Sequence, residues 1–138
     1  MTKPLVVFPD VQSAGAGVLR AALAGRSEPY VVGATVGTRV PETPDLPYVM
    51  VRKDTDAPHP SMANARCTLR VTVWHADADQ AHDLAMLCQG LLLVHSGPVM
   101  RGCRPATGPL PAVDDVSGID LSTCTVLANV RPTVLAPQ

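Results

Sequence analysis

The sequence has few aromatic residues and few charges. Only one Trp, two Tyr and one Phe occur among its 138 residues. Charged residues make up 17% of the chain, below the average of about 25%. Val, Leu and Ala must therefore fill most of any core, and the length predicts a single domain over residues 1–138.

Lysine is also scarce, because nine of the eleven basic residues are Arg. The formal net charge is −1 at pH 7. Such a balance argues against tight nucleic-acid binding, which needs a concentrated basic patch. It remains compatible with a protein through which nucleic acid passes without being gripped.

Long hydrophobic runs are absent. No stretch approaches the roughly 20 apolar residues of a membrane helix, and the apolar run in MTKPLVVFPD is too short for a secretory signal. We therefore expect no membrane association and no export, so that the cysteines stay reduced. They show no CxxC or CxxH spacing, which argues against a zinc knuckle and predicts buried thiols at Cys67, Cys88, Cys103 and Cys124.

The first predicted element is a helix in DVQSAGAGVLRAALAG, with Asp10 as its N-cap. Gly25 stands where a helix end favours a residue with positive φ. Gly15 and Gly17 each cost about 1 kcal/mol inside a helix. We expect both to be explained by close approach to a neighbouring element.

Strand patterns follow. Residues 30–40 and PYVMVRKD predict a hairpin around a proline-rich turn, and residues 66–74 alternate clearly between apolar and polar side chains. STCTVLANVR repeats that alternation, and MRGCRPATGPLPAVDDVSGID predicts two short strands. Together with a second helix ending near His95, this order predicts an α+β fold. Its sheet is mostly antiparallel, with two helices packed on one face.

Residues 54–65, DTDAPHPSMANA, have the composition of a loop and no periodicity. We expect this segment to be mobile and to order only against a partner. The candidate contact residues in it are Asp56, His59, Ser61, Met62 and Asn64.

Histidines and aspartates crowd into HADADQAHD, at the start of the second helix. Asp77 and Gln80 have the spacing of a capping box, and Asp79 falls in the first turn, where the helix dipole favours negative charge. A scaffolding role therefore accounts for most of the cluster. The alternative is a small metal-dependent hydrolase, which would use His59, His75, Asp77, Asp79 and His82.

The sequence contains no G-x-S-x-G, no HExxH and no glycine-rich phosphate loop. We therefore predict a protein that is not an enzyme and that needs no metal or cofactor. Candidate residues for subunit contacts lie instead on the outer side of the second helix and on the Thr/Arg strand faces. The candidates on the helix are His82, Met86, Gln89 and Leu93. The candidates on the strand faces are Arg66, Arg70 and Arg131. We expect these arginines either to meet an acidic residue of a neighbouring subunit, namely Asp114, Asp115 or Asp120, or to line a channel.

The chain resembles the tail terminator proteins of long non-contractile-tailed (siphovirus-type) bacteriophages. The resemblance covers nearly the whole chain and rests on the order of its segments after an N-terminal helix. These segments are VVGATVGTRVP, PYVMVRKD, RCTLRVTVWHADADQAHDLAMLCQGL, RPATGPLPAVDD and TVLANVRPTV.

The resemblance implies a virion protein that assembles in the host cytoplasm into a ring, commonly a hexamer. Such a ring caps the tail tube, ends tail polymerisation and joins the tail to the head connector, while DNA passes through its lumen without specific binding. Three alternatives stay open. They are another neck component such as a head-closure or connector protein, the metal-dependent hydrolase, and a dimeric binding module of the host.

Overall fold

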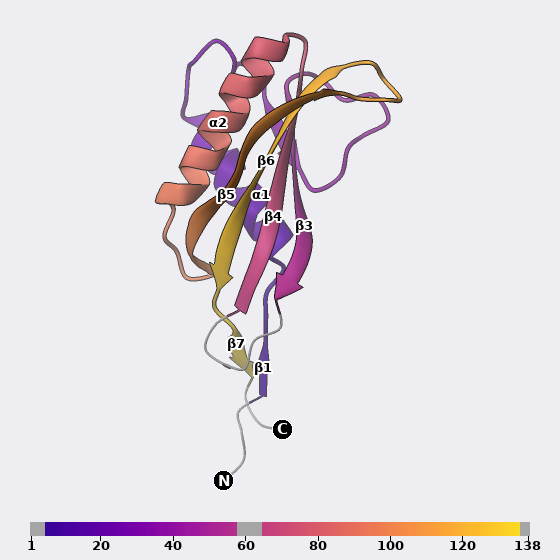
Figure 1. The fold of residues 1–138 in the computed structure, drawn as a ribbon. Coiled ribbons are helices and arrows are strands. Elements are labelled where there is room, and N and C mark those ends of the chain that lie inside the picture. Colours follow the sequence, from indigo (N-terminus) through magenta and orange to yellow (C-terminus); the bar gives the residue numbers. More distant parts are fainter. Residues whose placement is uncertain (1–4, 58–64, 136–138) are drawn as a thin grey trace.

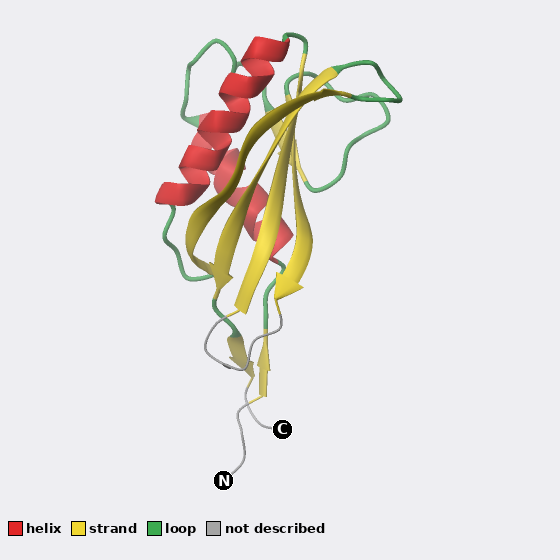
Figure 2. Cartoon of the chain, viewed as in Figure 1, coloured by secondary structure: helices red, strands yellow, loops and turns green. Residues whose placement is uncertain are grey.

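The computed structural model describes residues 5–57 and 65–135 and shows an α+β domain. Five strands form one sheet in the order β2-β3-β4-β6-β5, and two helices cover one of its faces (Figure 2). The elements are β1 Leu5–Val7, α1 Val11–Ala24, β2 Thr35–Gly37, β3 Tyr48–Ala57, β4 Ala65–His75, α2 Ala78–Val94, β5 Met100–Val113, β6 Asp120–Val130 and β7 Thr133–Leu135.

Helix α1 begins where the sequence predicts. Asp10 caps it by accepting hydrogen bonds from the backbone N–H groups of Gln12 and Ser13. A Cβ on Gly15 would lie 3.2 Å from side-chain carbons of both Leu69 and Val51, so close packing explains this glycine. Two expectations are wrong. No atom lies within 4 Å of such a Cβ on Gly17, and Gly25 ends the helix with φ −94°.

The predicted hairpin of residues 30–40 with PYVMVRKD is also wrong. Only Thr35–Gly37 is a strand, and it pairs parallel to β3, with Thr35 opposite Tyr48. The proline-rich connection is long enough to carry the chain back to the starting end of the sheet, which a parallel pair requires. The Tyr48 hydroxyl fixes this connection by donating to the Arg39 carbonyl.

Strands β3 and β4 form the antiparallel centre of the sheet. Both continue into the segment predicted as a loop, because β3 extends to Ala57 and β4 begins at Ala65. Asp56 therefore belongs to a strand, opposite Cys67. The other four contact candidates of that loop, His59, Ser61, Met62 and Asn64, lie outside the described residues.

One long strand replaces the two short strands predicted between α2 and the last strand. Strand β5 pairs antiparallel to β6, and three register shifts interrupt the pairing. Among the described strands it is an edge, so its prolines need only one paired side. Bulges absorb the residues that do not fit the ladder.

The core lies between the sheet and the helices. Alternate residues of β4 point into it, and Leu69, Val71 and Val73 are fully buried. Cys67, Cys88 and Cys124 are buried as predicted, whereas Cys103 is half-buried. Burial raises the pKa of Cys88, and it raises that of Cys124 to about 11, so both thiols remain protonated at neutral pH.

Strands β1 and β7 form a separate antiparallel ribbon, which sequence patterns did not predict. The ribbon lies beyond one end of the main sheet, whereas the turn between β5 and β6 lies at the other end (Figure 1). In the described part of the chain, no helix is long and apolar enough to cross a membrane.

Candidate subunit interfaces

The helices leave one face of the sheet open. Residues that alternate with the core positions stand on this face, and strand register aligns them in rows. Thr68 lies opposite the exposed Leu127, whereas Thr72, opposite Thr123, is buried. Two apolar side chains on this face are well exposed, Leu127 at 43% and Leu110 at 64%. The open face therefore mixes threonine and arginine with exposed leucine, a composition suited to a contact surface.

Arg70 has an acidic partner within its own chain. Its Nε and Nη2 atoms both lie 3.0 Å from Asp54 Oδ2, across the β3–β4 pair. This pair within the chain was not predicted, since Asp114, Asp115 and Asp120 were named as partners of Arg70 in a neighbouring subunit. A pair this exposed contributes at most about 1 kcal/mol of stability.

The other arginines of the Thr/Arg faces have different surroundings. Arg66 is exposed on β4 opposite Asn129, and Arg131 is exposed just beyond β6. Arg52, which the sequence argument did not single out, lies beside Arg70 and donates to the Thr38 carbonyl at 3.2 Å. These side chains give the open face a cationic band whose role in assembly stays a prediction.

Asp114 is occupied by contacts within its own chain. Its Oδ2 accepts from the Trp74 indole at 2.9 Å, and its Oδ1 accepts from the backbone N–H of Val116 at 2.8 Å and of Ser117 at 3.2 Å. The indole hydrogen bond, helped by the two backbone donors, lowers the pKa of Asp114. This carboxylate therefore organises the turn between β5 and β6.

Of the other two acidic candidates, Asp120 opens β6 opposite His75, and Asp115 is exposed at the β5–β6 turn. Asp115 is thus the candidate best placed to reach another molecule. Val116, its neighbour, is 97% exposed.

The outer side of α2 contains two of the four predicted contact residues. His82 is exposed and Met86 is 50% exposed, whereas Leu93 is half-buried against the core. Val94 is 80% exposed and occupies the end of this surface. We call His82, Met86 and Val94 the α2 outer surface.

The prediction that Gln89 faces outward is wrong. Gln89 is buried, and its Nε2 donates to the carbonyls of Thr107 at 2.9 Å and Thr125 at 3.2 Å. These carbonyls lie where register shifts interrupt the β5–β6 ladder. Apolar residues surround nearly the whole helix, so periodicity did not fix which side carries Gln89.

The His/Asp cluster has a structural role in α2. His75 is buried, with Nε2 3.3 Å from the Tyr30 carbonyl, and its Nδ1 accepts from the Asp77 backbone N–H. Asp77 caps the helix as predicted by accepting from the Asp79 N–H at 3.0 Å. The predicted capping box with Gln80 is not formed, because the Asp77 side chain accepts from the Asp79 N–H and the Asp77 N–H donates to His75.

Within residues 5–57 and 65–135, no three His, Cys, Asp or Glu side chains are placed to hold a metal ion together. His75 points into the domain, whereas His82 lies on the α2 outer surface. His59, the remaining histidine of the hydrolase alternative, lies outside the described residues.

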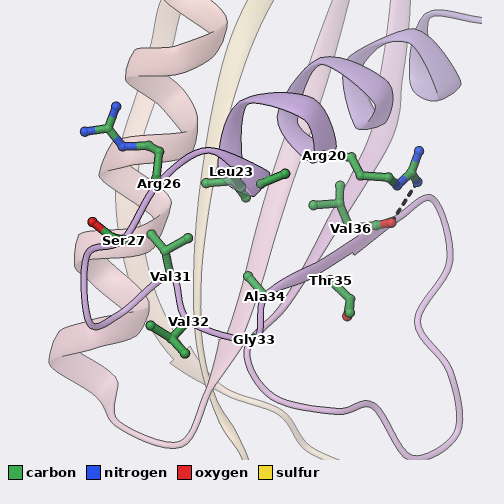
Figure 3. A pocket seen from close by; sticks show the side chains of 11 residues that line it. Arg20, Leu23, Arg26, Ser27, Val31, Val32, Gly33, Ala34, Thr35 and Val36 are labelled. Carbon is green, nitrogen blue, oxygen red and sulfur yellow. Dashed lines mark hydrogen bonds between the residues drawn. The ribbon is translucent and has the colours of Figure 1, made fainter.

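Sequence reasoning missed a hollow beside β2, between this strand, the end of α1 and the turns that follow (Figure 3). Its volume is about 720 Å³. Arg20 and Arg26 stand on opposite sides of it, and Arg20 Nη2 donates to the Val36 carbonyl at 2.8 Å. Apolar side chains make up most of its lining, namely Leu23, Ala24, Val31, Val32, Ala34 and Val36.

The β1–β7 ribbon adds a further apolar surface. Leu5 is 63% exposed and Val134 65% exposed. A ribbon of two short strands has little stability of its own in water. Its exposed apolar side chains make the ribbon a further candidate for contact with another chain.

No protein-family model matches this chain, and no curated protein matches it in sequence.

Proposed function

We propose that this chain is a phage structural protein, a tail terminator that assembles into a ring on the end of the tail tube. The ring stops the addition of further tube subunits and provides the surface to which the head connector attaches. DNA passes through its lumen without specific binding, in keeping with the net charge of −1.

One observation supports the proposal most: exposed apolar residues stand on separate surfaces of one small domain. Met86 and Val94 lie on α2, Leu110 and Leu127 on the open sheet face, and Leu5 and Val134 on the β1–β7 ribbon. A closed dimer needs a single self-complementary patch. A ring subunit between a tube and a connector needs two lateral contacts and two axial ones.

The α2 outer surface is our candidate for one lateral contact. Met86 is flanked by His82 and sits on a rigid helix, so burying it against a neighbour requires little ordering of the chain. The open sheet face, with Arg66, Arg70 and Arg131 at or near it, either meets another neighbour or lines the lumen. The ribbon, at one end of the sheet, is our candidate for contact with the tube or the connector (Figure 1).

The proposal is tested by measuring tail lengths in a phage that lacks this gene. A ring that stops polymerisation predicts overgrown tubes without heads, with normal length restored when the gene is supplied in trans. A head-closure or connector protein predicts tails of normal length that fail to join heads, and this result would overturn the terminator assignment. Unchanged infectious particles would overturn any role in the neck.

A further inference from the structure

We infer that the β5–β6 turn of one copy inserts into the hollow beside β2 of the next copy, so that this contact closes the ring laterally. The inference rests on the proposed ring and names the two surfaces that meet. It also identifies Asp115 and Arg20 as an ion pair between subunits.

Strand register places the turn and the hollow at the same end of the sheet. Thr35 on β2 lines the hollow and lies opposite Tyr48 on β3. On its other side, Tyr48 lies opposite Trp74 on β4, and Trp74 lies opposite Leu121 on β6. Leu121 in turn lies opposite Ala112, next to the turn. One transverse row of residues therefore runs across all five strands from the hollow to the turn.

The two surfaces also lie on opposite flanks of the subunit, because β2 and β5 are the two edges of the sheet. Four inter-strand spacings of about 4.8 Å separate these edges. A neighbour displaced sideways along this row brings its turn to the hollow of the first copy. Such a contact joins two different surfaces, which is the kind that closes into a ring.

The turn is rigid before it meets a partner. Asp114 Oδ1 accepts from two backbone N–H groups of the turn, its own N–H donates to the Ile119 carbonyl at 2.9 Å, and its carbonyl accepts from the Gly118 N–H at 2.8 Å. Gly118 adopts φ 72°, a conformation that favours glycine. This turn holds Val116 out at 97% exposure, and insertion of a fixed turn costs little conformational entropy.

The hollow offers matching chemistry. Its apolar lining, including Val32 at 67% exposure, can cover Val116 and Val113. Arg20 donates to a neutral carbonyl, so its charge can still attract the carboxylate of Asp115 beside Val116. Because Arg20 already occupies the Val36 carbonyl at the β2 edge, the contact involves side-chain insertion rather than addition of a strand.

Cysteine cross-linking of the full chain tests the inference. Val116→Cys and Val32→Cys are combined in one chain, rings are scored by electron microscopy, and the sample is oxidised and run on a non-reducing gel. Both positions are exposed, so the substitutions should leave the fold intact. We expect a ladder of covalent oligomers that extends beyond the dimer, because each copy links to a different neighbour on each flank.

The control chain combines Val32→Cys with Val134→Cys. Val134 is 65% exposed and lies on the β1–β7 ribbon, at the end of the sheet away from the hollow. We expect its cross-linked fraction to be several-fold lower, and Val32→Cys alone measures any background from Cys103. Rings that form without the ladder, or a ladder of equal strength in the control, would overturn the inference and leave the terminator assignment standing. Absence of rings, both in purified protein and on tail tubes, would overturn both.

Discussion

Gln89 on α2 and Thr107 on β5 are joined by a partly buried hydrogen bond, in which the Gln89 Nε2 atom lies 2.9 Å from the Thr107 carbonyl oxygen. The same nitrogen serves the Thr125 carbonyl of β6. The Gln89 carboxamide thus donates to two backbone carbonyls beside a bulge. These hydrogen bonds fix α2 on β5 and β6, the two strands that continue into the β5–β6 turn. The α2 outer surface and the turn are thereby held in a fixed relation.

We expect Gln89→Ala to lower the free energy of unfolding by about 1–3 kcal/mol, because two partly buried carbonyls would lose their donor. Met86→Ala on the exposed side of the same helix is the matched control, with an expected change within about 0.5 kcal/mol. Urea unfolding of both variants provides the measurement. Equal stabilities of the two variants would show that the Gln89 contact contributes nothing.

The turn should respond to acid through Asp114. The Trp74 indole holds the pKa of this carboxyl below its ordinary value of 3.8, so the stabilisation is fully present above pH 3.8 and is lost as pH falls through the lowered pKa. Trp74 is the only tryptophan in the chain, so its fluorescence reports this change directly. We expect the low-pH change in emission to be absent in Asp114→Asn, and its persistence there would assign the transition to another group.

Two glycines of α1 provide a matched pair of substitutions. Gly17→Ala should stabilise the protein by up to about 1 kcal/mol, because alanine favours the helix and its Cβ meets no other atom. Gly15→Ala should gain less or lose stability, since its Cβ would press on Leu69 and Val51 at 3.2 Å. Thermal unfolding compares them, and a larger gain at Gly15 than at Gly17 would contradict the packing described for α1.

Met86→Asp tests the lateral contact through α2. Met86 is 50% exposed, so the monomer should fold normally, but a charge buried between subunits should prevent ring formation. Val40→Asp, at a position 42% exposed in the connection between β2 and β3, is the control and should leave assembly unchanged. Circular dichroism and electron microscopy are the readouts. Normal rings from Met86→Asp would remove the α2 outer surface from the interface.

Arg70→Glu distinguishes two positions of the open sheet face in the ring, one against a neighbouring subunit and one on the lumen. The change breaks an exposed pair with Asp54, so we expect a loss of stability below about 1 kcal/mol, restored by adding Asp54→Arg. Ring formation by the single variant decides the position. Weakened rings place the face against a neighbour, whereas intact rings place it on the lumen.

The sequence predicted those elements whose alternation is strict. Residues 66–74 alternate without a break, and β4 was located within one residue at either end. Asp10 and Asp77 likewise marked both helix starts, because an N-cap is a local interaction between neighbouring residues. Features that depend only on neighbouring residues could therefore be predicted without knowledge of the fold.

Features that depend on distant partners were missed. The ribbon of β1 with β7 joins segments at opposite ends of the described chain. The parallel pairing of β2 depends on the path of the connection to β3, and the unbroken β5 pairs with β6 through three register shifts that interrupt any regular pattern. Gln89 was predicted on the wrong side of α2, because its partners are backbone carbonyls at a bulge and the periodicity of the sequence does not predict that bulge. The hollow beside β2 is formed by turns after α1, where the sequence carries no repeating pattern.

The most direct test of the account is cryo-electron microscopy of complete phage particles at a resolution that identifies this chain. We predict one layer of the chain in a ring on the head-proximal end of the tail tube, with the α2 outer surface covered by an adjacent copy. Density for the chain elsewhere in the particle, or Met86 facing solvent in every assembled form, would contradict it.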